Sequence, residues 1–124
     1  MTFYKIETCK VAHEDNRRSL MPIYNGDFTA KQLKILRIKE DSVLGNHYHN
    51  YSECFYVFSG SPIFILEDIK SGRRVRLPLD EGDRLIIQPK VAHKVIAQKG
   101  TIMIESTERE YISPEKNDVR YELA

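Results

Sequence analysis

Three of the four histidines lie in two short segments whose residue types could bind a metal ion. His47 and His49 are two residues apart, and Glu53 follows at the same parity. Alternate side chains of an extended chain share one face, so these three would point the same way after a short loop at residues 50–52. A helix would instead turn the two imidazoles about 200° apart. The spacing therefore predicts a shared site on a strand, whereas His13 lies among polar residues and is expected at the surface.

The second segment supplies His93, which follows a predicted strand and the turn residue Pro89. A metal ion is held rigidly when its ligands come from more than one strand. Three imidazoles and one carboxylate form a mixed nitrogen and oxygen set that suits Mn, Fe, Co, Ni, Cu or Zn. Such a set leaves one or two coordination positions open for water or substrate. We therefore predict one divalent transition metal ion on His47, His49, Glu53 and His93; a polar pair of surface histidines is the alternative.

The elements that must position these side chains are short β-strands. Few stretches repeat apolar residues at helical spacing, whereas short runs rich in Val, Ile, Leu, Phe and Tyr alternate with turn residues. Close spacing of short strands indicates a sandwich or closed barrel. The sequence thus predicts an all-β, single-domain protein over residues 1–124, whose polar tail from Ser113 wraps the outside before a last extended contact at 119–123. The predicted strands are 3–8, 20–24, 32–39, 53–58, 63–68, 73–79, 84–88, 94–97 and 102–106, with a hairpin turn at 70–73.

Length and composition limit the possible partners and compartments. The chain has 124 residues, enough for one domain with its own core. Lys plus Arg total 19 against 18 Asp plus Glu, and the charges are interleaved, so no nucleic acid partner is expected. No apolar run approaches the ~20 residues of a membrane helix, and residues 1–10 lack the apolar core of a signal peptide. Cys9 and Cys54 match no metal or redox spacing and are expected to be reduced packing residues. We expect a cytoplasmic protein that does not bind membranes.

The first histidine segment resembles the first conserved motif of the cupin family. That motif has a glycine, a His-X-His, a glutamate and a second glycine. His47, His49, Glu53 and Gly60 match it at the right intervals, while Asp41 stands where the leading glycine would be.

The second segment is similar to the second cupin motif but departs from it at the turn. Gly82 and His93 keep the family's separation. Gln88 stands at the proline position, Lys90 at the glycine and Ala97 at the asparagine. The ligand positions are therefore present, and the turn before His93 is altered.

The resemblance covers residues 32–108 and implies a single-domain cupin, a double-stranded β-helix or jelly-roll barrel with its metal-binding core in that range. Residues 31–50, 56–60 and 108–122 are similar to the cupin domains of mannose-6-phosphate isomerases and to small cupins that isomerise or epimerise nucleotide-linked keto-sugars. An "Asp-X-Arg" tail of those relatives corresponds to Asp118 and Arg120. The resemblance implies a homodimeric isomerase or epimerase of a phosphorylated or nucleotide-linked sugar.

That activity assigns expected roles to four further residues. The metal ion would polarise the sugar carbonyl and stabilise an enediolate oxygen. A general base within hydrogen-bond reach of the reacting carbon is also needed, and Tyr56, Glu105 or a metal-bound hydroxide are the candidates. Arg37 is expected to bind a phosphate in fork geometry, and Tyr51 to turn its ring towards substrate.

Two other functional classes fit the same sequence. A metal-dependent dioxygenase of a small organic substrate could use three histidines and a glutamate equally well. The barrel could also bind a sugar or small ligand without catalysis, since one fold hosts many functions. Metal content, oxygen uptake and turnover distinguish these alternatives.

Overall fold

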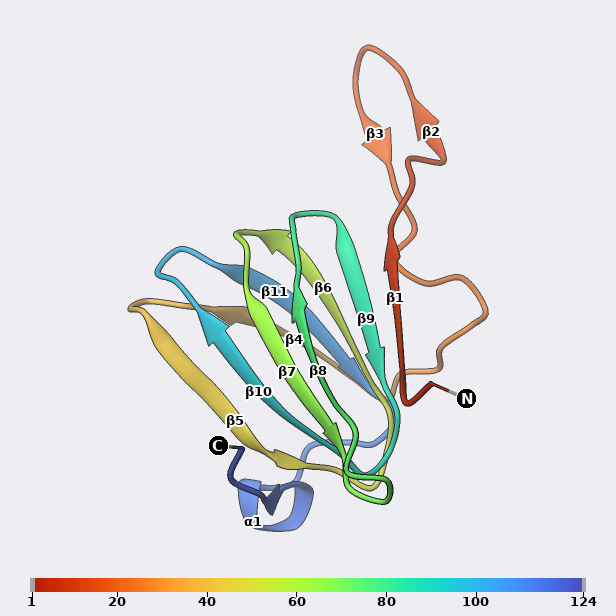
Figure 1. The fold of residues 1–124 in the computed structure, drawn as a ribbon. Coiled ribbons are helices and arrows are strands. Elements are labelled where there is room, and N and C mark those ends of the chain that lie inside the picture. The colour runs from red at the N-terminus through yellow and green to blue at the C-terminus, as the bar shows by residue number, and fades with distance from the viewer. Residues whose placement is uncertain (1, 124) are drawn as a thin grey trace.

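Two five-stranded antiparallel sheets face each other and form the body of the protein, seen here in a computed structural model that describes residues 2–123 (Figure 1). The neighbouring strands of one sheet are β1 (Tyr4–Thr8), β9 (Asp83–Ile87), β6 (Glu53–Ser59), β11 (Ile102–Thr107) and β4 (Gln32–Arg37). Those of the other sheet are β12 (Val119–Arg120), β5 (Ser42–Tyr48), β10 (Val91–Ala97), β7 (Ile63–Asp68) and β8 (Arg74–Pro78). The predicted all-β architecture is confirmed.

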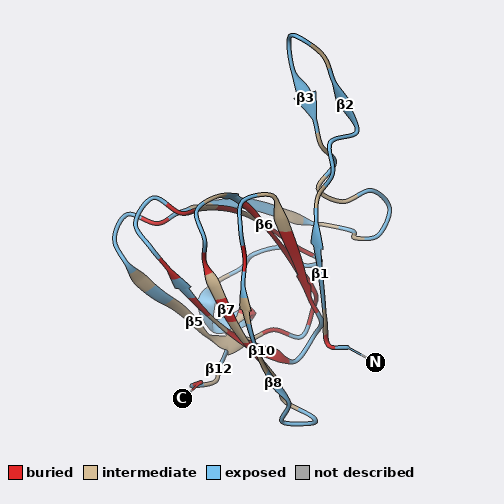
Figure 2. Cartoon of the chain, turned by 45° about the horizontal axis from the view of Figure 1, so that its top comes forward, coloured by how far each residue is buried: buried red, intermediate tan, exposed pale blue. Residues whose placement is uncertain are grey.

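The core lies between the two sheets and follows from the alternation of side chains along each strand. On β6, Phe55 and Val57 point inwards and are buried, and Phe55 packs edge-on against Phe64 of β7. Figure 2 shows buried residues concentrated where the sheets face each other, with exposed residues outside and in the loops. The buried apolar cluster is Phe3, Ile38, Phe55, Val57, Phe64, Leu66, Leu79, Leu85, Ile87, Val91, Val95, Ala97 and Met103.

Most predicted strands are present, and two predictions were wrong in instructive ways. The predicted strand 20–24 contributes only Leu20 to a two-residue strand, because residues 21–24 lie across the outside of the first sheet without pairing. Strand β5 was missing from the predicted strand ranges, since Gly45 and Asn46 interrupt its apolar pattern, although the spacing of His47 and His49 predicted a strand there. Both have positive φ, at 96° and 58°, and form a bulge within the strand.

A short hairpin extends from the barrel as a separate arm (Figure 1). Its strands are β2 (His13–Glu14) and β3 (Ser19–Leu20), which pair only with each other. His13 lies at the surface, as predicted, with Nε2 3.0 Å from Asp15 Oδ2. The base of the arm is fixed by the buried guanidinium of Arg84, which donates to the Ile23 carbonyl and the Asp27 carboxylate.

The C-terminal segment crosses one end of the barrel (Figure 1). It contains a short helix, α1 (Pro114–Asn117), which the sequence did not predict, with Ser113 as its N-cap. Strand β12 then pairs with the end of β5 and supplies the extended contact that was predicted near 119–123. No helix among residues 2–123 is long and apolar enough to span a membrane.

Candidate active site

The bulge in β5 places the first two histidines beside the third. His47 pairs directly with His93 of β10, and the register shifts at the next residue because Gly45 and Asn46 occupy one pairing position. A methyl group at Gly45 would lie 2.6 Å from the main-chain oxygen of His93, so only glycine allows this approach. The two histidine-bearing strands are therefore in close main-chain contact.

In the turn before His93, Lys90 stands where the cupin motif has a glycine. Lys90 adopts a left-handed conformation with φ 62°. Its N–H donates to the His49 carbonyl oxygen at 2.7 Å. The altered turn thus still anchors one histidine segment to the other.

The side chains of His47, His49, His93 and Glu53 lie close together. The ring centroid of His47 lies 4.7 Å from the ring centroid of His49 and 4.7 Å from that of His93. The carboxylate of Glu53 lies between the imidazoles of His49 and His93. Its Oε1 is 2.9 Å from His49 Nε2, and its Oε2 is 3.3 Å from His93 Nε2. The loop at residues 50–52 returns Glu53 to the histidine face at the start of β6.

The local environments give the imidazoles different proton affinities. Burial, with the neighbouring His93 and His49, lowers the pKa of His47 to about 3. Burial also lowers the pKa of His93. Burial also acts to lower the pKa of His49. The hydrogen bond to Glu53 and the charge of the Glu53 carboxylate outweigh burial, so the pKa of His49 is raised. The site thus combines neutral imidazoles with one that favours a proton.

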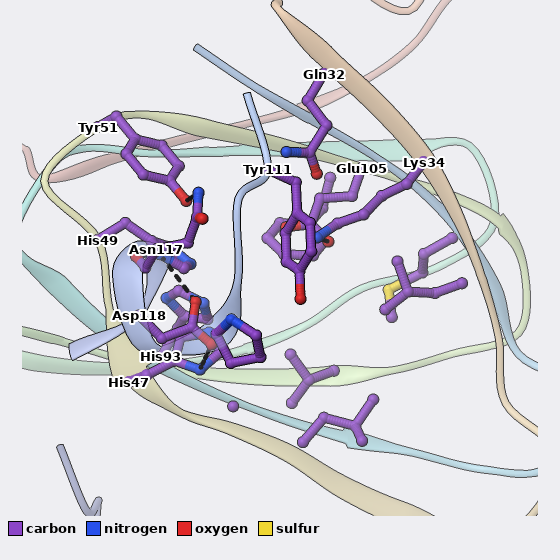
Figure 3. Close-up of a pocket in the computed structure, with 17 residues that line it drawn as sticks. Gln32, Lys34, His47, His49, Tyr51, His93, Glu105, Tyr111, Asn117 and Asp118 are labelled. Carbon is purple, nitrogen blue, oxygen red and sulfur yellow. Dashed lines mark hydrogen bonds and ion pairs between the residues drawn. The ribbon is translucent and has the colours of Figure 1, made fainter. Parts of the chain in front are cut away.

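These groups line a cavity of about 290 Å³ beneath the C-terminal segment (Figure 3). Its wall includes polar side chains from β4, from the β5–β6 connection and from the tail, with an apolar floor between the sheets. The lining residues are Gln32, Lys34, Leu36, Leu44, Gly45, His47, His49, Tyr51, Phe55, His93, Val95, Met103, Glu105, Tyr111, Pro114, Asn117 and Asp118.

A second carboxyl group, that of Glu105 on β11, lies next to Glu53. Burial raises the pKa of Glu105 to about 9, and the charge and hydrogen bond of Glu53 add to this effect. The ammonium of Lys34 lies 3.5 Å from Glu105 Oε1 and 5.6 Å from the centre of the Tyr111 ring. At neutral pH Glu105 is therefore a carboxylic acid able to donate a proton.

The structure brings together some predicted residues and separates others. Glu105 lines the cavity, and the Tyr51 ring stacks on His49 with centroids 4.8 Å apart. Tyr56 does not reach it: alternation along β6 turns its side chain to the outer face, opposite Arg84. Arg37 also lies outside the cavity, whereas Lys34, on the other face of β4, lines it.

Sequence reasoning missed the contribution of Lys34, Tyr111 and Asn117. Lys34 has the parity of Gln32 and Leu36, which could have indicated its face once the inward side of that strand was known. Tyr111 and Asn117 belong to an irregular segment whose position no periodicity predicts.

The three histidines form a cluster that fits a divalent transition metal ion, and the predicted fourth ligand, Glu53, is not part of that cluster. The ligand atoms of His47, His49 and His93 all lie within 4.8 Å of one another. Glu53 Oε2 is buried and has no hydrogen-bond partner among the described residues. Neutral imidazoles and an ionised carboxylate are the forms that bind metal ions. A cation among these four side chains would satisfy the buried oxygen.

Two facing antiparallel sheets enclose a histidine-lined cavity, the arrangement of a jelly-roll barrel. No protein-family model matches the sequence, and no curated protein matches it. Solved structures do. WlaRB of Campylobacter jejuni, a TDP-quinovose 3,4-ketoisomerase, has a TM-score of 0.83 and 21% identity, covering 97% of this chain and 94% of that one.

Two further structures agree with this result. WlaRA, a TDP-fucose-3,4-ketoisomerase of Campylobacter jejuni, has a TM-score of 0.80 and 21% identity over 95% of this chain and 89% of that one. A mutant of the 3,4-ketoisomerase QdtA of Thermoanaerobacterium thermosaccharolyticum, in complex with TDP-4-keto-6-deoxyglucose, has a TM-score of 0.78 and 17% identity over 97% and 88%. The chain therefore has the cupin fold of these sugar ketoisomerases.

Proposed function

We propose that this protein is an isomerase or epimerase of a nucleotide-linked keto-sugar. The observation that carries the proposal is the convergence of His47, His49 and His93 on one cavity, with the buried Glu53 carboxylate against His49 and His93. The fold shared with TDP-sugar ketoisomerases supports it. At about 290 Å³ the cavity is at the small end of ligand pockets, which suits a sugar ring with its nucleotide lying outside.

The reaction needs a proton acceptor and a proton donor close together. A proton leaves the carbon beside the carbonyl, and a proton returns to the neighbouring carbon, so the carbonyl moves without an oxidant. His47 is the acceptor in this proposal, because its imidazole is neutral and its side chain, 24% exposed, opens to the cavity. His49 is the donor, since both of its ring nitrogens lie beside hydrogen-bond acceptors. Glu105 is a second proton donor.

We further propose that His47, His49, Glu53 and His93 can hold a divalent transition metal ion. Such an ion supplies positive charge beside the sugar oxygen that becomes negative. Histidines that bind a metal ion cannot also transfer protons, so the roles given above to His47 and His49 apply to the metal-free protein. Metal content therefore separates the two chemistries.

The direct test is incubation of the full chain with TDP-4-keto-6-deoxyglucose in D2O, followed by NMR. We expect the keto group to migrate or a sugar carbon to be epimerised, with deuterium at the exchanged carbon. H47N should lower turnover by about 100-fold or more. The matched control H13N, in the exposed arm, should keep wild-type activity. Absence of both conversion and exchange in the wild type would overturn the proposal.

Metal analysis completes the assignment. Stoichiometric metal in protein purified without chelator or nickel resin, lost in H49A, would support the metal site and reject proton transfer by His47 and His49. Full turnover by metal-free protein would assign proton transfer to the histidines alone. Oxygen uptake coupled to turnover would favour a dioxygenase.

We also propose that the chain forms a homodimer in a reducing compartment such as the cytoplasm. The outer face of the first sheet exposes Leu33, Ile35 and Phe58, each more than half accessible, and the projecting arm exposes Val11 and Leu20. A two-stranded hairpin is marginally stable alone in water, so the arm is expected to pack on another surface. Sedimentation should give a dimer for the wild type and a monomer for L33K. Both cysteines are unpaired, consistent with reducing conditions.

A further inference from the structure

The tail that covers the cavity, residues 108–123, has two buried residues, Asn117 at 5% exposure and Leu123 at 4%. Leu123 lies at the far end of the tail, where its N–H donates to Asn46 Oδ1. In the part of the tail that precedes it, Tyr111 and Ile112 are exposed and Asn117 alone is buried. Burial of apolar side chains therefore does not explain how this part of the tail is held.

The Asn117 side chain makes every hydrogen bond that an amide can make here. Its Oδ1 accepts from the N–H groups of Ile112 and Ser113, at 2.8 and 3.1 Å. Its Nδ2 donates to the Tyr51 hydroxyl and the Glu110 carbonyl, both at 3.1 Å. These partners fix the amide orientation, because a flipped amide would point its NH2 group at two N–H groups.

The main chain of Asn117 reaches the catalytic histidine directly. Its carbonyl oxygen lies 2.6 Å from His49 Nδ1. A carbonyl only accepts, so Nδ1 must carry the hydrogen, which leaves Nε2 to face Glu53. The adjacent Asp118 approaches the same nitrogen, at 3.4 Å, and His47 Nδ1 at 3.5 Å.

We propose that Asn117 is a positioning residue of the site. Its side chain folds the tail over the cavity and holds the Tyr51 ring against the His49 imidazole, while its carbonyl fixes the Nδ1 hydrogen of His49 (Figure 3). The effect on turnover rests on the proposed function, whereas the effect on His49 does not.

The test compares N117A with the matched control E115A, whose exposed side chain lies on the same short helix. In the wild type we expect a slowly exchanging Nδ1–H resonance of His49 by NMR. In N117A we expect rapid exchange of that proton and of the Ile112 and Ser113 amides, and a kcat about 10- to 100-fold lower with a smaller change in KM. E115A should match the wild type in all three measurements.

A third variant separates positioning from general loosening of the tail. Y51F removes only the hydroxyl that Asn117 holds, so the Nδ1–H should stay protected while kcat falls less than in N117A. If N117A does not fold, N117D replaces it in the test. The aspartate keeps the two hydrogen bonds accepted from Ile112 and Ser113, so we expect the same changes as in N117A but smaller.

The proposal is overturned if the His49 Nδ1–H stays protected when Asn117 is replaced, whatever happens to activity. It is also overturned if E115A and N117A behave alike. Altered His49 exchange in a protein that converts no keto-sugar even as wild type would support the positioning role and reject the proposed function.

Discussion

Gly45 lies against the main chain of His93, and this contact brings two of the three imidazoles together. A β-carbon at Gly45 would meet the His93 oxygen at 2.6 Å, and the φ of 96° disfavours any side chain there. Gly45 therefore positions the two histidine-bearing strands because it has no side chain, which allows close main-chain contact.

G45A should destabilise the protein and separate His47 from His93. The matched control is G26A, because Gly26 has a similar φ of 88° but no atom within 4 Å of an added β-carbon. We expect G26A to lower the unfolding free energy by about 1–2 kcal/mol, the cost of a left-handed backbone. G45A should lose clearly more, because the clash adds to that cost. Equal losses in denaturant unfolding would show that the contact with His93 does not matter.

Isosteric substitutions should distinguish the two neighbouring glutamates. Glu105 is protonated at neutral pH, so E105Q replaces one neutral group by another and should change the unfolding free energy by less than about 1 kcal/mol. E53Q removes the charge that pairs with His49 and His93, and should cost about 1.5–3 kcal/mol or more. Urea unfolding of metal-free protein at pH 7 measures both; the reverse order would mean that Glu105 carries the charge.

The raised pKa of Glu105 also predicts a pH dependence of stability. The native state retains a proton up to about pH 9, whereas the unfolded chain releases it near 4.5. The contribution of Glu105 to the free energy of unfolding is therefore fully present below about pH 4.5. It decreases as the pH rises towards 9. E105Q lacks the titration, so its stability relative to the wild type should grow between pH 5 and 9. Parallel stability curves for the two proteins would contradict this.

Lys34 rather than Arg37 should affect substrate binding. Lys34 lines the cavity beside Glu105 and Tyr111, while Arg37 lies outside it. Loss of a charged hydrogen bond costs about 1.5–3 kcal/mol, so K34M should raise KM by about 10- to 100-fold. R37M should stay within about twofold of the wild type in steady-state kinetics. A larger effect of R37M would place the substrate in a different hollow.

The part of the site that alternation controls was predictable from sequence. His47, His49 and Glu53 share a parity, and their convergence needs only an extended chain and a short loop. His93 was predictable through its separation from Gly82 in the cupin motif. Arg37 was misplaced because parity alone does not tell which face of its strand is inside. Tyr56 has the opposite parity to Glu53 on the same strand, so alternation already placed it on the outer face.

The rest of the site depends on long-range contacts without a periodic signal. Asn117 reaches His49 across 68 residues of sequence, and the segment that carries it has only a one-turn helix and a two-residue strand. The positive φ of Lys90 is likewise imposed by its turn, where the residue type gives no indication.

The division of the cavity between barrel and tail has a consequence for how new specificities arise. Substitutions around Tyr111 and Pro114 would reshape the part of the cavity wall that the tail provides without touching the hydrophobic packing between the sheets. Adaptation to a differently substituted ligand can therefore proceed there at little risk to folding, while the imidazole cluster stays unchanged.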